Sequence, residues 1–271
     1  ILKYLQIDLV TGSKTTAEKV GSLENLTISL NARNEWRKFT LEGYENFNQL
    51  IDELAISIGE DNSYIVMQRA YAIFQKLRIG LSERPAEDIV RLDNLLDIVL
   101  KSDLRNNALH FKAIVELVFL SKDCGIAQDF AKQAIDLGRS VDAYTTTGSV
   151  YFLCKDYDLS IKSFKNALAL APNDNGWFIT RYLIPSMYRA GYKDQIMEVL
   201  TPIIDATDIP ANLLAYYAFV KLKDEEIDTA KRYFDRAKSK GISKKYLTRY
   251  EMDEPTFNDF ASALNTLGEI P

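Results

Sequence analysis

Residue types capable of catalysis are few and scattered in this sequence. His110 is the single histidine, and imidazole is the side chain best suited to moving protons near neutral pH. Cys124 and Cys154 are the two cysteines, and no basic neighbour in the sequence would clearly lower either thiol pKa to make a nucleophile. We therefore predict no catalytic residues, no bound cofactor and a chain that is not an enzyme.

Metal binding is not indicated either. One histidine and two cysteines are too few nitrogen and sulfur ligands for an ordinary structural zinc site. The acidic run Asp224, Glu225, Glu226 and Asp228 supplies carboxylates, but it falls in a predicted turn, where solvated charges are usual. We predict no metal ligands in this chain.

The composition is that of a soluble globular protein of 271 residues, with 47% hydrophobic and 26% charged residues. A net charge of -5 argues against nucleic acid as a partner. No apolar run reaches the ~18 residues that a spanning helix needs, so no direct membrane insertion is expected. Two cysteines do not make a disulfide framework, and we predict reduced thiols and a cytoplasmic location.

The chain starts at Ile1 rather than Met and ends at Pro271. These ends are compatible with a processed chain or with one region of a larger protein.

Residues 141–174 carry a pattern of aromatic and small side chains that is typical of two antiparallel helices packed face to face. The pattern consists of Tyr144, Thr147, Gly148, Tyr151, Ser160, Phe164, Ala167 and Pro172. It resembles a tetratricopeptide repeat, with Thr147 in place of the usual Leu and Ser160 in place of the usual Ala. The resemblance implies an α-solenoid in which each repeat is a helix pair, helix A followed by helix B.

The same helix B pattern occurs on both sides of this segment. Ala127, Ala131 and Ala134 stand 33 residues before Ser160, Phe164 and Ala167. Ala230, Phe234 and Ala237 stand 70 residues after them, which leaves room for an intervening, degenerate repeat. Because the family recurs at about 34 residues, we predict three to four repeats over residues 108–242, with the best match at 141–174.

The amino-terminal residues alternate apolar and polar positions, which favours half-buried strands. The apolar members of the alternation are Leu5, Ile7, Leu9, Leu26, Ile28, Leu30, Phe39 and Leu41. We predict a small antiparallel β-sheet covered by a helix that contains Phe47 and Leu54. The predicted fold class is mainly α, a solenoid like that of tetratricopeptide repeats, with this small sheet-and-helix module at its amino end.

Four domains follow from these patterns. They are a β-rich module at 1–58, a helical hairpin adaptor at 59–107, the repeats at 108–242 and capping helices at 243–271.

A second stripe lies beside the packing stripe on each helix A, and in the family that stripe lines the concave groove. Here it combines aromatic side chains with scattered charges, which suits a peptide segment or another protein partner. The predicted stripe consists of Lys112, Glu116, Phe119, Thr145, Ser149, Phe152, Phe178, Arg181, Tyr188, Tyr216, Phe219 and Lys223. An alternative is that the chain's own last helix, Thr256–Leu267, covers these aromatic side chains and that they bind nothing.

The predicted function is a non-catalytic scaffold for protein–protein interaction, with a peptide segment or partner bound in the concave groove. The alternative is a noncatalytic region of a larger bacterial enzyme, such as a glycosyltransferase or a sulfotransferase. The partner's identity and the oligomeric state are left open by the sequence.

Overall fold

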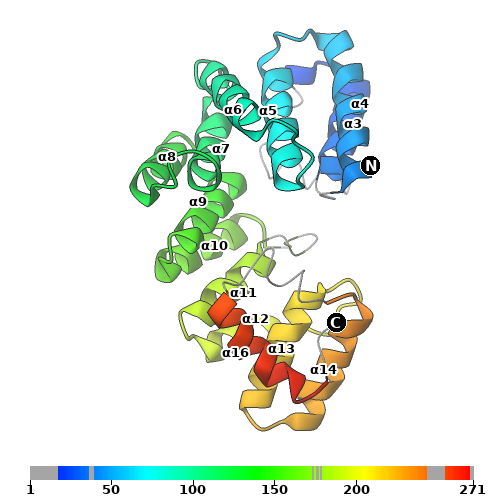
Figure 1. Ribbon diagram of the computed structural model, residues 1–271, viewed down its shortest axis with the longest axis vertical. Helices are drawn as coiled ribbons and strands as arrows, with labels where there is room; N and C mark the ends of the chain where they lie inside the picture. Colours follow the sequence, from blue (N-terminus) through cyan, green and yellow to red (C-terminus); the bar gives the residue numbers. More distant parts are fainter. Residues whose placement is uncertain are drawn as a thin grey trace. The chain divides into compact units, whose positions relative to one another are not determined.

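The computed structural model describes residues 18–36, 40–172, 174, 177, 179–242 and 254–268. All regular elements in these ranges are helices, and no strand occurs among them. The chain divides into two compact units, Ile1–Cys154 and Lys155–Pro271, each of which is described by itself (Figure 1).

Unit 1 is built from consecutive helices that pack in pairs. Helix α3 packs on α4, α5 on α6 and α7 on α8, while α9 packs against both α7 and α8. The helices are α3 (Leu23–Trp36), α4 (Leu41–Ile58), α5 (Ser63–Arg78), α6 (Pro85–Val99), α7 (Arg105–Val118), α8 (Cys124–Leu137) and α9 (Val141–Leu153).

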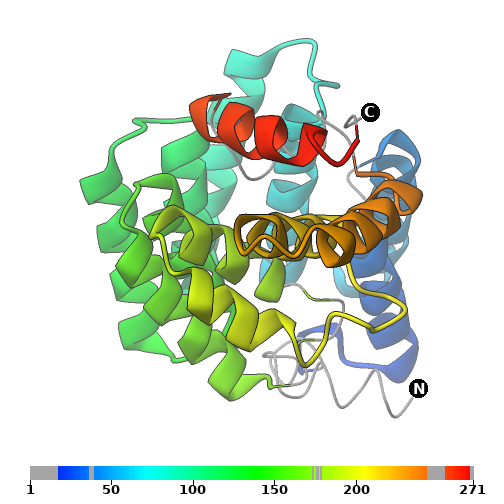
Figure 2. The same cartoon turned by 90° about the horizontal axis from the view of Figure 1, so that it is seen from below.

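Unit 2 continues the same local organisation. Helix α10 packs on α11, α11 on α12 and on α13, and α13 on α14, while α16 packs on α13 (Figure 2). The helices are α10 (Tyr157–Leu170), α11 (Thr180–Arg189), α12 (Lys193–Leu200), α13 (Ala211–Lys223), α14 (Ile227–Ser239) and α16 (Glu254–Asn265).

Polar side chains cap the first turns of several helices. Thr40 accepts a hydrogen bond from the Gly43 amide at 3.0 Å, and Ser140 accepts one from the Ala143 amide at 3.0 Å. Such caps satisfy amides that have no partner within the helix, and each contributes about 1 kcal/mol. They therefore fix where α4 and α9 begin.

A left-handed backbone residue recurs in the turns that separate α7 from α8, α9 from α10, α11 from α12 and α13 from α14. The residues are Lys122 (φ 57°), Lys155 (φ 64°), Gly191 (φ 78°) and Glu225 (φ 63°). They are spaced by 33, 36 and 34 residues, close to the period expected of a tetratricopeptide repeat. The backbone therefore repeats across residues 105–239 even where the side chains do not.

The small and aromatic residues predicted for helix B are fully buried. Ala127, Ala131 and Ala134 of α8 have no exposed surface, and neither do Ser160, Phe164 and Ala167 of α10 or Ala230, Phe234 and Ala237 of α14. The described helices thus agree with repeats like those of the tetratricopeptide family, in consecutive pairs.

The predicted amino-terminal β-sheet is wrong. Leu26, Ile28 and Leu30 lie in α3, and Leu41 begins α4. The predicted strand residues Leu5, Ile7, Leu9 and Phe39 lie outside the described residues.

The helical period of α3 was hidden because polar side chains share its buried face. Its buried residues are Asn25, Leu26, Ser29 and Ala32, at helical spacing. Asn25 Nδ2 donates to the Val20 carbonyl at 2.7 Å and to Ser57 Oγ at 3.1 Å, while Ser29 is hydrogen-bonded to the Tyr64 hydroxyl. These partners satisfy the polar groups, so burial costs little.

Helices α5 and α6 occupy the segment predicted as a hairpin adaptor, and α16 lies in the segment predicted to cap the array. The boundaries at 58, 107 and 242 stay predictions.

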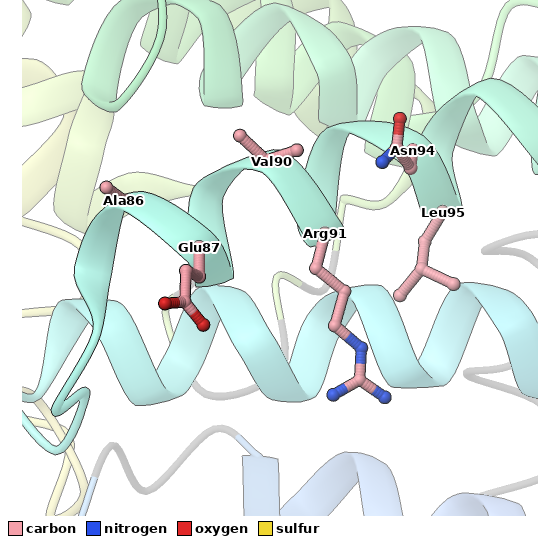
Figure 3. A pocket seen from close by; sticks show the side chains of 6 residues that line it. All are labelled: Ala86, Glu87, Val90, Arg91, Asn94 and Leu95. Atoms are coloured by element: carbon pink, nitrogen blue, oxygen red, sulfur yellow. The ribbon is translucent and has the colours of Figure 1, made fainter.

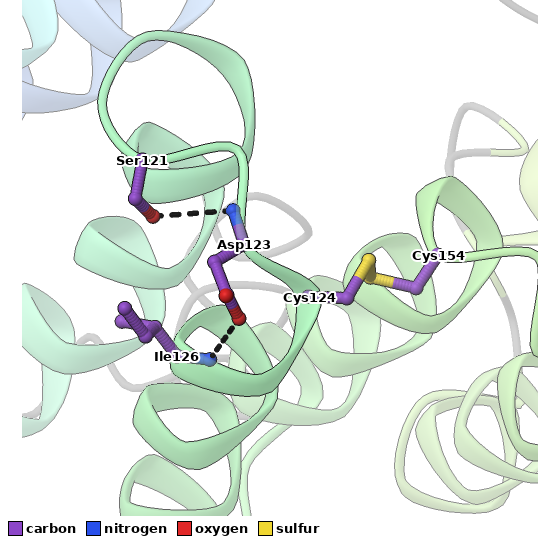
Figure 4. The surroundings of a disulfide bond; sticks show 5 residues. All are labelled: Ser121, Asp123, Cys124, Ile126 and Cys154. Atoms are coloured by element: carbon purple, nitrogen blue, oxygen red, sulfur yellow. Dashed lines mark hydrogen bonds between the residues drawn. A yellow bond between two sulfur atoms is a disulfide. The ribbon is translucent and has the colours of Figure 1, made fainter.

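A disulfide joins Cys124, at the start of α8, to Cys154, directly after α9 (Figure 4). This finding contradicts the predicted reduced thiols. The turn before Cys124 is held by Ser121 Oγ, which accepts from the Asp123 amide at 3.1 Å, and by the Asp123 carboxylate, which accepts from the Ile126 amide at 3.1 Å. The bond crosslinks two neighbouring helices within unit 1.

Replacing Ala167 with Leu should lower the free energy of unfolding by about 1 to 3 kcal/mol, because the added side chain overpacks a buried contact of α10. Ala169 lies on the exposed side of the same helix, so Ala169→Leu is the matched control and should change stability little. Urea unfolding of both variants measures the difference. Equal midpoints would contradict the close packing at Ala167.

Loss of the disulfide should destabilise the protein by about 2 to 4 kcal/mol, because the bond constrains a loop with a sequence separation of 30 residues in the unfolded chain. Thermal unfolding with and without a thiol reductant provides the measurement. The Cys124→Ser/Cys154→Ser variant is the control and should melt at the lower temperature whether or not reductant is present. A wild-type midpoint that ignores reductant, while free thiols are detected, would refute the expectation.

Candidate partner-binding surface

Lys112, the first charged member of the predicted stripe, is buried and already paired. Its Nζ donates to Asp97 Oδ1 at 3.0 Å and is also bonded to Asp93, and both carboxylates belong to α6. Burial opposes the charge, but the two carboxylates outweigh it and raise the pKa of Lys112. The ammonium group therefore ties α7 to α6 and is not presented to a partner.

The other stripe residues of unit 1 also make contacts within the unit. Glu116 accepts a hydrogen bond from Ser121 Oγ at 2.9 Å, and the Phe119 ring lies 5.5 Å from that of Phe74. Thr145 is buried and donates to the Val141 carbonyl at 2.7 Å, while Ser149 donates to the Thr145 carbonyl at 3.0 Å. Phe152 is half-buried near the end of α9.

An aromatic cluster in unit 1 was not anticipated from the sequence. Tyr71 of α5 contacts Trp36 of α3 and Phe111 of α7, with ring centroids 5.5 and 4.5 Å apart. Beside it, Arg33 of α3 forms an ion pair with Asp142 of α9 at 3.8 Å. Burial and the Asp142 carboxylate both raise the pKa of Tyr71, so the phenol stays neutral. The cluster joins four helices that are far apart in sequence.

His110 is buried in α7 and does not present an acid or base to solvent. Burial lowers the pKa of His110 below its ordinary value of 6.5, and the Asp142 carboxylate opposes this shift in part. The native protein therefore holds a neutral imidazole near neutral pH, in a position suited to packing.

Three stripe residues of unit 2 form one aromatic surface, which we call the α11–α13 surface. It consists of Tyr188 of α11 with Tyr216 and Phe219 of α13. The Tyr188 ring lies 5.5 Å from Tyr216 and 5.3 Å, edge-on, from Phe219. Such offset and edge-to-face contacts are the favoured arrangements of aromatic rings.

Helix α16 covers the α11–α13 surface. The Phe260 ring lies 5.8 Å from Tyr188, 5.2 Å from Tyr216 and 5.0 Å, stacked, from Phe219. Phe260 and Leu264 have no exposed surface, and Tyr216 and Phe219 are buried too. The last helix therefore contacts three of the aromatic residues that the alternative interpretation of the sequence expected it to cover. A role of these residues in binding a partner stays a proposal.

The remaining members of the predicted stripe differ in accessibility. Lys223 is exposed at the edge of the α11–α13 surface, with its Nζ 5.3 Å from the centre of the Phe219 ring. Arg181 is half-buried, and its guanidinium lies 5.7 Å from the centre of the Tyr182 ring. Phe178 lies outside the described residues.

A shallow pocket lies on α6, and none of its lining residues belongs to the predicted stripe (Figure 3). All of its lining residues belong to this one helix, and Val90 among them is 61% exposed. The lining consists of Ala86, Glu87, Val90, Arg91, Asn94 and Leu95. It is an open helix face rather than an enclosed cavity.

The described residues hold neither a metal-binding cluster nor a membrane-spanning helix. Side chains of His, Cys, Asp and Glu do not gather there in groups of three or more that could hold a metal ion. None of the helices in the same ranges is long and apolar enough to cross a membrane.

Helices in consecutive pairs with a recurring turn define an all-helical repeat architecture in the described part of the chain. No protein-family model matches the sequence, and no curated protein matches it. A solved structure that is similar is a tetratricopeptide repeat protein from Parabacteroides merdae ATCC 43184, at 13% identity and a TM-score of 0.48, over 97% of this chain and 99% of that one. A likeness this distant carries no argument about function.

The stability of the protein should fall as the pH drops below about 6.5, because the unfolded chain protonates His110 there while the native state resists protonation. The slope contributed by one such proton is at most about 1.4 kcal/mol per pH unit. His110→Gln should remove this contribution, and the difference between the two pH profiles isolates it because the chain has a single histidine. Urea unfolding from pH 7.5 to 5 measures both, and parallel profiles would contradict the assignment.

Proposed function

We propose that this chain is a non-catalytic scaffold that resembles tetratricopeptide repeats. We propose that it binds a protein segment along the predicted stripe, which lies on the first helix of each helix pair. The α11–α13 surface is the part of the predicted stripe that is proposed to bind. A partner with apolar anchors would bury them against Tyr188, Tyr216 and Phe219, and acidic groups on the partner would face Lys223.

One observation carries this proposal. The α11–α13 surface already holds an amphipathic helix, α16, through a ring that contacts three aromatic side chains at once. Aromatic side chains gathered in a desolvated centre with an exposed cation at the edge are the usual anatomy of an interaction hot spot. The six stripe residues of unit 1 do not carry the proposal, because the described contacts of Lys112, Thr145 and Ser149 are internal.

The cytoplasmic location stays a prediction, and the disulfide weighs against it. Reducing compartments keep thiols reduced, whereas disulfides persist in oxidising ones. Rapid alkylation of the protein in its source cell, followed by mass measurement, would distinguish the two states of Cys124 and Cys154.

Reversing the charge of Lys223 should weaken partner binding several-fold, because it places a carboxylate at the edge of the α11–α13 surface. The effect should shrink at high salt, since exposed charges are screened. Affinity capture from the source cell, with Lys223→Glu compared against the wild type, provides the measurement. Circular dichroism checks that the helices are intact.

Lys231→Glu is the matched control, because Lys231 is an exposed lysine of α14 whose partner is Asp235 of the same helix. Partners recovered equally by the wild type, Lys223→Glu and Lys231→Glu would exclude the α11–α13 surface as the binding site.

A further inference from the structure

Helix α16 contacts the rest of unit 2 through an apolar face. Its buried residues are Phe260, Ala261 and Leu264, followed by Leu267 just after the helix, which is the spacing of a single helical stripe. Ser262 and Asn265, on the other side, are exposed. The helix is thus amphipathic.

The place of α16 differs from that of a helix that only extends an array. Such a helix would pack on the last pair, α13 and α14, and bury their outer face. Phe260 instead reaches Tyr188 of α11, in the preceding pair, as well as Tyr216 and Phe219 of α13. Helix α16 therefore packs on α13 and also reaches α11 through the contact of Phe260 with Tyr188, on residues of the predicted stripe.

Residues 240–253 separate α14 from α16 in the sequence. A segment joined by a short linker meets its own binding surface at an effective concentration on the order of mM. A helix from another protein must compete with the high effective concentration of the attached α16. The attached α16 would therefore lower the apparent affinity of the α11–α13 surface for a helix of another protein. Because the α11–α13 surface is already complementary to one amphipathic helix, it can bind a similar helix without a change in conformation.

We propose that the α11–α13 surface is a docking site for an amphipathic helix of a partner protein, and that α16 occupies this site in cis until the partner displaces it. The partner helix carries an aromatic residue in the place of Phe260, a small residue next to it and leucines four and seven positions later. The inference rests on the proposed function and specifies its partner and its regulation.

An aromatic anchor is required by the geometry of the seat. The Phe260 ring stacks on Phe219 and meets Tyr188 and Tyr216 at steep angles, so an aliphatic side chain would lose all three ring contacts. A helical partner is favoured over an extended one because the backbone groups of a helix are hydrogen-bonded within the helix. Such a partner therefore needs only side-chain contacts with the surface. The small residue next to the anchor corresponds to Ala261, which is also buried.

The test uses the full chain with a protease site inserted between residues 243 and 253. Cleavage frees α16 from the chain without changing any residue of the helix or of its seat. Binding of a fluorescent peptide of residues 254–268 is then followed by anisotropy, before and after cleavage and removal of the released segment. We expect the cleaved protein to bind the peptide at least about tenfold more tightly than the intact one.

Two peptide variants give the matched controls without touching the protein. A Phe260→Ala peptide should lose binding, because it lacks the ring that contacts the three aromatic residues. A Ser262→Ala peptide changes an exposed position and should bind as the unmodified peptide does.

Three results would overturn the inference. In the first, the cleaved protein loses its helical circular dichroism when the segment leaves, which would make α16 a structural cap. In the second, the peptide binds the intact and the cleaved protein equally, or binds neither. In the third, light scattering shows that the intact protein forms dimers by exchanging α16, which would make a second copy the occupant.

Failure of this inference can be told from failure of the proposed function. The peptide assay uses the chain's own helix, so its result does not depend on any cellular partner. If the peptide behaves as expected but Lys223→Glu leaves the captured partners unchanged, the docking site exists and the proposed scaffold function at this site fails.

Discussion

Close approach between neighbouring helices is the constraint on which each unit depends. A single pair buries only one of its faces, so it is stable only when the next pair covers the other. Small side chains allow this, and they stand at fully buried positions of α8, α10 and α14, such as Ala131, Ala167 and Ala237. Because these buried positions hold alanine, a larger side chain at any of them would force the neighbouring helices apart.

The sequence predicted the helix pairs best where small residues recur. The repeats predicted over 108–242 rest on positions such as Ala134 and Ala167, and both of these residues are buried, as the pattern required. The amino-terminal helix α3 was missed because Asn25 and Ser29 occupy its buried face and left a short apolar alternation as the visible signal. The disulfide was missed because two cysteines 30 residues apart do not reveal their distance in the fold.

The predicted stripe shows a second limit of prediction from the sequence, which concerns the contacts of a side chain. A stripe position gives the direction of a side chain but not what the neighbouring helix offers to it. Lys112 points to two carboxylates of α6, which the sequence of α7 alone does not show. Tyr216 and Phe219 point to α16, whose sequence did indicate an amphipathic helix. The partners of Lys112 could be identified only from the tertiary structure. The contact of the aromatic residues with the last helix could be predicted from the sequence, as an alternative to partner binding.

The recurring turns have a consequence for how such a chain can change over time. Lys122, Lys155 and Glu225 hold left-handed backbone angles that glycine, as at Gly191, adopts without strain. Each non-glycine residue there raises the energy of the native state by roughly 1 kcal/mol. Lys122 and Lys155 precede Tyr188 by more than 30 residues, whereas Glu225 follows Tyr216 by only nine. Glycine in place of either lysine would therefore stabilise the native state without changing a residue of the α11–α13 surface.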